Sequence, residues 1–197
     1  MTAGGGEGRE YFEEVKRALD GALPQAEAFI GELYRAYLDG RQIFMIGNGG
    51  SAANASHFSQ DLNKGTVAGL SAAKRFRAVS LADNVPFLTA LANDEGYDSV
   101  FAGQLKALGR PGDLLVAISV SGNSPNVLRA AEHAGGHGMR VIGITGRSGG
   151  RLAELAQESL RVPSEDFGVV ETVHSAVFHL AVARLRGRIA GQRQGGA

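Results

Sequence analysis

The sequence contains no cysteine, and its charged residues balance to a formal net charge of zero. Without cysteine the chain has no disulfide, no thiolate nucleophile and no thiolate metal ligand, so a metal would need histidine, carboxylate or amide ligands. The zero net charge excludes recruitment to nucleic acid or to an anionic membrane by bulk charge, although a local basic patch stays open. No apolar run is long enough to span a membrane, and residues 1–8 lack the features of a secretion signal. We therefore expect a cytoplasmic protein that binds neither nucleic acid nor membrane.

Glycine, in contrast, is abundant: 29 of the 197 residues are glycine, and several follow directly after apolar runs. Glycine in such places usually marks a tight turn or the close approach of a ligand. Residues 1–8 and 191–197 are rich in glycine and lack apolar periodicity, so we predict flexible tails there. The length of the chain and the even composition of the sequence between these tails predict one domain over residues 9–190.

Short apolar runs alternate with helical patterns along most of the chain. Continuous apolar strands between helices are typical of a parallel sheet covered on both faces, so we predict an α/β fold, a three-layer sandwich with a five-stranded parallel sheet. The predicted strands are Gln42–Ile46, Arg77–Leu81, Leu114–Ser119, Arg140–Ile144 and Ser159–Val162. The predicted helices between and after them are Ala52–Asn63, Val85–Asn93, Val100–Leu108, Asn126–Ala134, Gly150–Ala156 and Val169–Ile189.

The segment Tyr11–Leu38, ahead of the first strand, carries apolar residues at helical spacing. Gly21 and Pro24 fall inside it, and proline in a helix interior removes a hydrogen bond and clashes with the preceding turn. We therefore expect an extra N-terminal helix pair, which is more than a small sheet needs and is suited to packing against another subunit.

Two loops that follow predicted strands carry groups suited to an anion, and ligands of open parallel sheets bind beyond the carboxyl ends of the strands. The first is Gly47-Asn-Gly-Gly-Ser51, whose serine can cap a helix with free N–H groups; a plain tight turn is an equally frequent explanation. The second is Ser119-Val-Ser-Gly-Asn-Ser-Pro125, which offers hydroxyls and backbone N–H groups without a nearby lysine. Such a set suits a phosphomonoester that is held rather than transferred. A well-capped serine-rich turn is the alternative, less attractive because two such loops occur in one sheet.

Histidines and carboxylates are spaced on two predicted helices so that they can hold a metal ion. His57 and Asp61 are four residues apart and share a helix face. Glu171 and His179 are eight residues apart, about 80° around a helix axis, and can converge on one point. Two histidines and two carboxylates suit zinc, although a single helical histidine is more often packed or exposed than a ligand. His174, on the same helix, points at a wide angle from His179.

Together these segments resemble the sugar isomerase (SIS) domain family over nearly the whole chain, most closely its sedoheptulose 7-phosphate isomerase (phosphoheptose isomerase) branch. The resemblance rests on motifs in the expected order: Gly47–Ser51, His57, Ala92–Asp94, Ile118–Ser124, Gly143–Gly146 and Val162-Pro163. It implies an aldose–ketose isomerase that converts sedoheptulose 7-phosphate to a D-glycero-heptose 7-phosphate through a cis-enediol, in heptose biosynthesis. It also implies a homotetramer.

The resemblance further implies roles for individual residues. Ser119, Ser121 and Ser124 would hold the phosphate, while Asn93 and Asp94, otherwise a plain polar turn, would contact sugar hydroxyls. The full substrate set is Asn48, Gly49, Gly50, Ser51, Asn93, Asp94, Ser119, Val120, Ser121, Ser124 and Glu171.

The resemblance also implies a zinc ion held by His57, Asp61, Glu171 and His179. Asp61 stands where the family usually has Glu, and Glu171 where it has Gln. Asp61 is the implied base and His179 its acid–base partner, with Glu171 as a second candidate for the base. Because Asp is one methylene shorter than Glu, its carboxylate withdraws unless the helix moves.

Other functions stay open at this point. An isomerase of another long-chain ketose phosphate is a variant of the first hypothesis. A non-catalytic SIS protein of the replication-initiator-associating type is an alternative from another class, since the run Ser51–His57 is similar to that group; carboxylates at 61 and 171 favour the enzyme. A sugar-sensing regulator ranks last, because no DNA-binding segment precedes residue 40.

Overall fold

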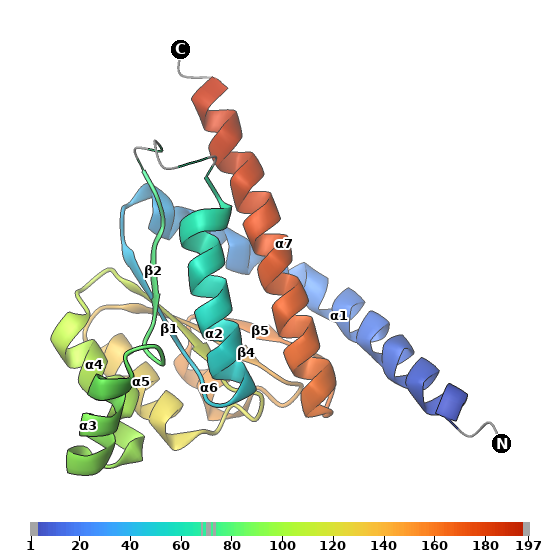
Figure 1. The fold of residues 1–197 in the computed structure, drawn as a ribbon, viewed down its shortest axis with the longest axis horizontal. Helices are drawn as coiled ribbons and strands as arrows, with labels where there is room; N and C mark the ends of the chain where they lie inside the picture. Colours follow the sequence, from blue (N-terminus) through green and yellow to red (C-terminus); the bar gives the residue numbers. More distant parts are fainter. Residues whose placement is uncertain (1–3, 68, 70–71, 73, 195–197) are drawn as a thin grey trace.

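In the computed structural model, residues 4–67, 69, 72 and 74–194 are described, and the statements below concern those residues. Five parallel strands form one sheet in the order β2-β1-β3-β4-β5, with helices on both faces (Figure 1). The strands are β1 Gln42–Ile46, β2 Arg77–Ser80, β3 Leu114–Ile118, β4 Arg140–Thr145 and β5 Glu158–Arg161. The predicted α/β fold with a parallel sheet is confirmed, and each strand lies within one residue of its predicted bounds.

The helices divide into two layers, each with its own apolar core. One layer holds α1 (Gly4–Leu38), α2 (Gly50–Gln60) and α7 (Phe167–Gln194). The other holds α3 (Val85–Glu95), α4 (Val100–Leu108), α5 (Pro125–Gly136) and α6 (Gly150–Leu155). Alternate residues of a strand enter opposite cores: Ile43 and Met45 join the first, while Phe44 and Ile46 join the second. This alternation is why the strands are apolar throughout.

The predicted N-terminal helix pair is wrong, because α1 is one continuous helix of 35 residues that passes through Pro24. Its buried face runs without a break from Ala18 to Tyr37, so packing against the body offsets the one backbone bond that proline removes. Gly21 serves close approach rather than a break, since a β-carbon there would lie 2.6 Å from the ring of Pro163. The first turns of α1 extend beyond the body (Figure 1).

The chain ends are also more regular than predicted. Residues 4–8 and 191–194 lie within α1 and α7, whereas residues 1–3 and 195–197, the rest of the predicted tails, lie outside the described residues. The single-domain boundaries stay a prediction.

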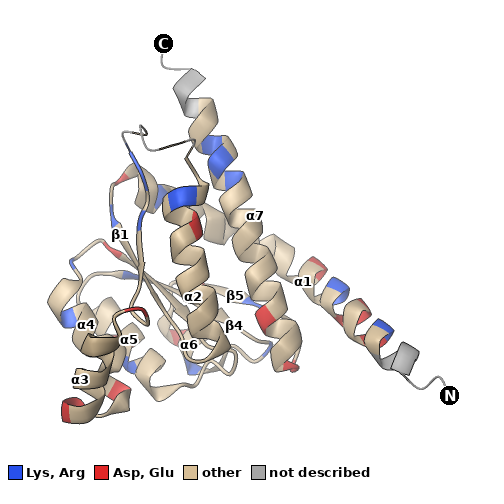
Figure 2. Cartoon of the chain, viewed as in Figure 1, with Lys and Arg blue, Asp and Glu red and all other residues tan. Residues whose placement is uncertain are grey.

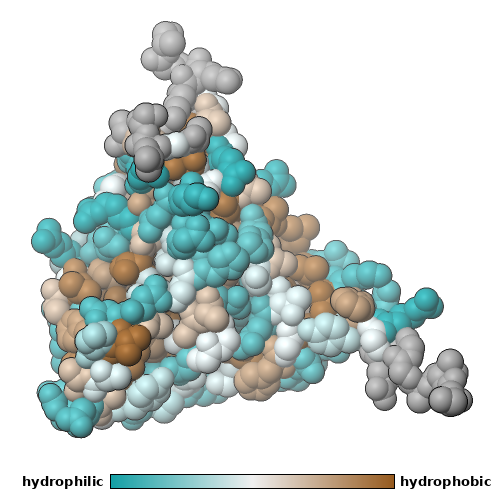
Figure 3. All heavy atoms as spheres, viewed as in Figure 1, coloured by the Kyte–Doolittle hydropathy of each residue, from teal (hydrophilic) through white to brown (hydrophobic). Residues whose placement is uncertain are grey.

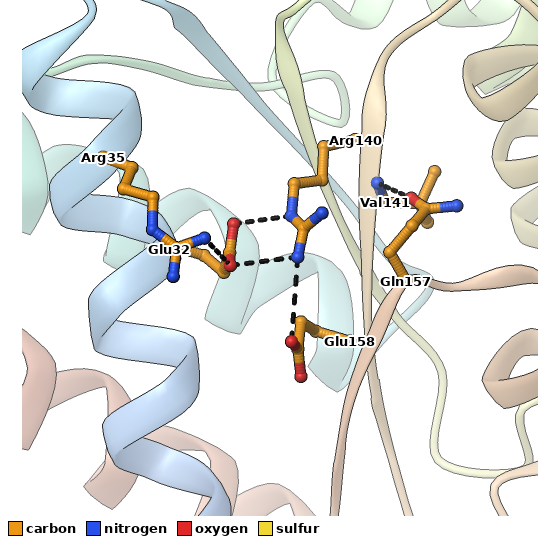
Figure 4. A network of polar contacts seen from close by, with 6 residues as sticks. All are labelled: Glu32, Arg35, Arg140, Val141, Gln157 and Glu158. Carbon is orange, nitrogen blue, oxygen red and sulfur yellow. Dashed lines mark hydrogen bonds and ion pairs between the residues drawn. The ribbon is translucent and has the colours of Figure 1, made fainter.

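A buried carboxylate fixes the middle of α1 to the sheet (Figure 4). Glu32 is only 5% exposed, and its oxygens lie 2.5 Å from Arg140 Nε and 2.5 Å from Arg35 Nη1. Arg140, at the start of β4, also lies 3.7 Å from Glu158 of β5. The carboxylate is thus paired with two guanidinium groups, as a buried charge requires.

Side-chain polarity is unevenly spread over the surface. Basic residues gather toward the C-terminal end of α7 and at the turn η1 (Asp61–Gly65) that follows α2 (Figure 2). Apolar atoms gather over α3, which has no buried residue of its own and exposes 59% of Val85 (Figure 3). Within the described residues, no helix has both the length and the apolar character needed to cross a membrane.

The strand order places a ligand crevice at one point of the sheet. From β1 the chain crosses to β2 on one side, and β3 then pairs with β1 on the other, with Ile46 opposite Ala117. In sheets of this order, the loops after β1 and β3 leave toward opposite faces and open a crevice between them. Those loops are the two glycine- and serine-rich segments selected from the sequence.

Candidate functional site

The loops after β1 and β3 meet in one cavity of about 270 Å³ at the carboxyl edge of the sheet. Most of the residues predicted to bind substrate line it, so the structure brings both loops to the same rim. The lining residues are Asn48, Gly49, Gly50, Ser51, Ile118, Ser119, Val120, Ser121, Ser124, Phe167 and Glu171.

The serine loop, residues 119–124, is folded so that its hydroxyls and the start of α5 face this cavity. Ser119 and Ser124 lie 3.1 Å apart through their Oγ atoms, and Pro125 begins α5 without needing a backbone donor. Gly122 has a positive φ of 66°, and a β-carbon there would lie 2.0 Å from the carbonyl oxygen of Gly149. Only glycine therefore fits this turn. Pro125 has no N–H, and the N–H of Val127 bonds to Ser124 and Asn126, so the start of α5 offers an anion the N–H of Asn126.

The glycine loop, residues 47–51, already faces a carboxylate. Glu171 on α7 lies so close to the first residue of α2 that a β-carbon on Gly50 would be 2.3 Å from Glu171 Oε2. The N-terminus of α2 attracts negative charge, and Glu171 supplies it. A phosphate dianion there would meet the Glu171 carboxylate, whereas none of the acidic residues that the structure describes lines the serine-loop side of the cavity. The phosphate is therefore best accommodated at the serine loop.

A second group of side chains, His57, Asp61 and His179, lies further along the same two helices. Asp61 Oδ2 is 3.5 Å from His57 Nε2 and 3.5 Å from His179 Nδ1. One donor atom from each residue lies within 4.8 Å of the other two. Both histidines are exposed and Asp61 is partly buried, so the three side chains are accessible from solvent.

Packing beneath these residues explains why they meet. Phe58 and Phe178, each adjacent in sequence to one of the histidines, stack face to face with ring centroids 4.3 Å apart. They are 2% and 4% exposed, so the stack is part of the core that joins α2 to α7. The imidazole rings of His57 and His179, just above, have centroids 5.1 Å apart.

Asp61 lies where α2 changes its winding. The helix passes at this residue into a π-helical turn, η1 (Asp61–Gly65), and such turns are frequent at functional sites. Beyond it, Asn63 exchanges hydrogen bonds of 2.7 and 2.9 Å with the backbone of Ala78 on the edge strand β2. The wider turn lets the carboxylate reach His179 while Asn63 keeps its bonds to the strand.

Glu171 lies between the two groups. It lines the loop cavity and also a second cavity of about 610 Å³ that contains His179, Asn54 and Ser175. Eight residues separate Glu171 from His179, roughly 12 Å along the helix at 1.5 Å per residue. An elongated ligand held at the serine loop therefore passes Glu171 before it reaches Asp61 and His179.

The predicted site is only partly assembled within one chain. Among the described residues, the group that could hold a metal ion contains His57, Asp61 and His179 but not Glu171. The metal role predicted for Glu171 is not supported by this geometry, because its carboxylate is held against Gly50 instead. Asn93 and Asp94 are exposed near the end of α3, bonded to each other at 2.7 Å, and they do not line the cavity.

Sequence reasoning missed several residues of the site. Asn126 is 2% exposed and bonds to Asn48, and Tyr97 donates to the same asparagine. Phe167 lines the loop cavity although it is 62% exposed. The one usable signal was Asn126, a polar residue in the first turn of a helix after a serine loop; the other two contacts depend on tertiary structure.

His174 stands apart from this chemistry, as its predicted angle suggested. It is fully buried, and its Nε2 lies 3.2 Å from the carbonyl oxygen of Thr145. Burial lowers the pKa of His174 to about 4, against a smaller opposing effect of that hydrogen bond. The ring is therefore neutral at ordinary pH and belongs to the core.

Comparison with known proteins gives one consistent result. A family model described as "SIS domain" matches residues 7–146. The chain is 45% identical over 161 residues to a phosphoheptose isomerase of Mycobacterium tuberculosis, covering 81% of each chain. It is 38% identical over 178 residues to a probable phosphoheptose isomerase of Thermoplasma acidophilum, covering 90% of this chain and 96% of that one. The solved phosphoheptose isomerase of Neisseria gonorrhoeae superposes with a TM-score of 0.83 at 32% identity, covering 92% of this chain and 97% of that chain.

Proposed function

The chain belongs to the SIS domain family, and we propose that it is a phosphoheptose isomerase, which interconverts sedoheptulose 7-phosphate and a D-glycero-heptose 7-phosphate in heptose biosynthesis. The observation that carries the proposal is the pairing of Asp61 with His57 and His179 at 3.5 Å, beside the two helices, α2 and α7, that line part of the cavity between the two loops. The relatives named phosphoheptose isomerase support the substrate. The chemistry is that of a phosphosugar isomerase.

The phosphate is proposed to bind at the serine loop, to the hydroxyls of Ser119, Ser121 and Ser124 and to the N-terminus of α5. Hydroxyls and backbone N–H groups hold a phosphomonoester without activating it for transfer. The wall of the cavity is completed by the backbone of Val120, Gly49 and Gly50 and by the side chains of Asn48 and Ser51. Contacts of Asn93 and Asp94 with sugar hydroxyls stay a prediction.

A seven-carbon chain held at its phosphate end extends past Glu171 toward the histidines. Its carbonyl end then points toward His179, about 12 Å along α7 from Glu171, and toward Asp61 on η1. In the proposed reaction, the Asp61 carboxylate takes a proton from one of C1 and C2 and returns it to the other. His179, 3.5 Å from Asp61, moves the proton between the two oxygens of the cis-enediol.

Glu171 has a different proposed role from either catalytic group. Glu171 lies between the proposed positions of the phosphate and of the carbonyl group of the substrate. We therefore propose that it contacts the hydroxyl groups in the middle of the sugar. It stays the second candidate for the base.

The donor set of His57, Asp61 and His179 fits a zinc ion. Two imidazole nitrogens and one carboxylate oxygen make three protein ligands, the number that catalytic zinc sites provide while leaving a position open. When bound there, a divalent ion supplies positive charge that polarises the carbonyl group and stabilises the enediolate.

Purified protein should interconvert sedoheptulose 7-phosphate and heptose 7-phosphate, followed by NMR of the sugar. Asp61→Asn and His179→Ala should each lower kcat by at least about 100-fold, the usual contribution of a general base or acid. His133→Ala, a histidine on α5 that lines a different hollow, is the matched control and should keep full activity. A wild-type protein that turns over neither this ketose nor related ketose phosphates would refute the proposed function.

Zinc is tested separately, by elemental analysis of protein purified without chelator. About one ion per chain is expected, and His57→Ala should lose it. Full activity in wild-type protein that contains no metal would remove zinc from the proposal.

The proposal includes a homotetramer in the cytoplasm. Tyr11 and Phe12 on α1 are 38% and 64% exposed, which supports an interface along the projecting part of this helix. Light scattering should give a mass near four times 20.5 kDa.

A further inference from the structure

Asn48, Asn126 and Tyr97 form a hydrogen-bonded unit that joins the glycine loop to α5 and η2 (Tyr97–Ser99). We propose that this unit, the amide clasp, fixes the distance between the two substrate-binding loops, with Asn126 and Tyr97 as positioning residues for the reaction. The inference rests on the proposed function for its catalytic consequence, but the clasp itself is visible without it.

The two asparagines pair side chain to side chain across 78 residues of sequence. Asn48 Nδ2 donates to Asn126 Oδ1 at 2.9 Å, and Asn126 Nδ2 donates back to Asn48 Oδ1 at 2.9 Å. This reciprocal pair ties the residue that follows β1 and Gly47 to the second residue of α5, the helix at the end of the serine loop.

Asn126 is the fixed member of the pair. It is 2% exposed, and its Oδ1 also accepts a hydrogen bond of 3.0 Å from the N–H of Val127 in its own helix. A buried amide held by its own backbone has no freedom to follow the loop, and leaving it unpaired would be costly. The glycine loop is therefore held to α5, and not the reverse.

Tyr97 holds the same asparagine from a second direction. Its hydroxyl donates to Asn48 Oδ1 at 3.1 Å, so this oxygen receives two donors. The short helix that carries Tyr97 is itself attached to α5, because Arg129 donates to Ser99 Oγ at 2.9 Å. Both contacts on Asn48 thus lead back to one rigid element.

The glycine loop is joined to its own helix by hydrogen bonds from the N–H groups of Ala52 and Ala53 to the carbonyls of Asn48 and Gly49, and the clasp adds the contact that fixes it relative to α5. Gly47, Gly49 and Gly50 give this backbone freedom that other residues lack. A substrate held at the serine loop must also fit against the glycine loop, and a misplacement of about 1 Å can lower the rate by about 100-fold. The clasp sets the alignment between the phosphate and the reacting carbons.

The experiment compares amide hydrogen exchange and kinetics in two variants with a matched control. Tyr97→Phe removes only the hydroxyl of a half-exposed ring, so the fold is kept. The N–H groups of Ala52 and Ala53 bond to the carbonyls of Asn48 and Gly49, so their exchange reports on the loop. This exchange should rise about 3- to 10-fold, as expected for loss of one hydrogen bond, and kcat should fall by a similar factor. The inhibition constant of inorganic phosphate, which needs only the serine loop, should stay within about twofold of wild type. Asn126→Ala should raise loop exchange further and lower kcat by up to about 100-fold.

Gln104→Ala is the control, because Gln104 is a buried amide, 1% exposed, that bonds at 2.9 Å to two backbone carbonyls away from both loops. It should lower the melting temperature but leave exchange at Ala52 and Ala53 and kcat unchanged. Unchanged loop exchange in both clasp variants, or an equal rise in Gln104→Ala, overturns the proposal. Raised loop exchange in a protein whose wild type does not turn over the sugar supports the clasp and rejects the isomerase, so the two failures are distinct.

Discussion

Replacing Gly50 by alanine should displace Glu171 without harming the fold. The alanine β-carbon would lie 2.3 Å from Glu171 Oε2 and 2.5 Å from Oε1, whereas ordinary contact begins near 3.4 Å. The carboxylate must therefore retreat by about 1 Å or rotate away. Gly50 does not have a positive φ and begins α2, so alanine suits its backbone and, by helix propensity, stabilises it by up to about 1 kcal/mol.

The expected signature is a loss of activity with unchanged or slightly increased stability. If Glu171 contacts the sugar as proposed, a displacement of about 1 Å lowers kcat/KM by up to about 100-fold, or about 2.7 kcal/mol of transition-state stabilisation. In a Glu171→Ala background the clash is gone, so Gly50→Ala should change kcat/KM by less than about threefold. The two changes should thus be strongly non-additive.

The assay is steady-state turnover of sedoheptulose 7-phosphate by the four proteins of this cycle, with urea denaturation of each. Gly187→Ala is the matched control, because Gly187 lies in α7 with no atom within 4 Å of an added β-carbon. It should keep full activity. An equal loss on adding Gly50→Ala to wild type and to Glu171→Ala would refute the reasoning, since the effect would then not pass through Glu171.

Two further predictions concern stability. Arg140→Leu leaves the buried Glu32 paired with Arg35 alone. It should lower the free energy of unfolding by about 2 kcal/mol, less than the roughly 3–5 kcal/mol typical of a fully buried pair, because Arg140 is partly exposed. Adding Glu32→Leu should recover most of this loss, whereas Arg151→Leu, which breaks an exposed pair with Glu132, should cost less than about 1 kcal/mol in urea denaturation. His174 has its pKa lowered from 6.5 to about 4 by burial, so the unfolded chain takes up the proton first as pH falls. The contribution of the neutral His174 ring to the free energy of unfolding is therefore complete above about pH 6.5 and is lost towards pH 4, by about 3 kcal/mol in total. The difference in unfolding free energy between wild type and His174→Leu should shrink over that pH range. A difference that does not change with pH would contradict a buried, neutral ring.

The sheet was predictable because its pattern is local and repeated. Each strand is an apolar run bounded by turn residues, and that pattern requires only that both faces be covered. The continuous α1 was not predictable from Gly21 and Pro24, because its stability comes from a buried face that packs on distant elements. The proline penalty is local, whereas the packing that offsets it is not.

In the site too, some features follow from local spacing in the sequence and others depend on tertiary contacts. His57 and Asp61 share a helix face by spacing alone, and the structure places them together. His179 joins them because Phe58 stacks on Phe178, a contact between helices that spacing cannot give. Glu171 was expected to converge with His179, but the position of its carboxylate depends on Gly50 across the cavity rather than on helix angles. The amide pair of Asn48 and Asn126 likewise exists only once β1 and β3 are neighbours.

The π turn at Asp61 has a consequence for how this region tolerates changes in length. One residue corresponds to about 100° of rotation around an ordinary helix, so removing one residue between Asp61 and Asn63 would force a choice. Either the asparagine keeps its bonds to Ala78 and the carboxylate swings away from His179, or the carboxylate stays and the edge strand loses its partner. Apart from Asp61 and Asn63 themselves, homologous chains should therefore vary in side chain within Asp61–Gly65 more readily than in the number of residues.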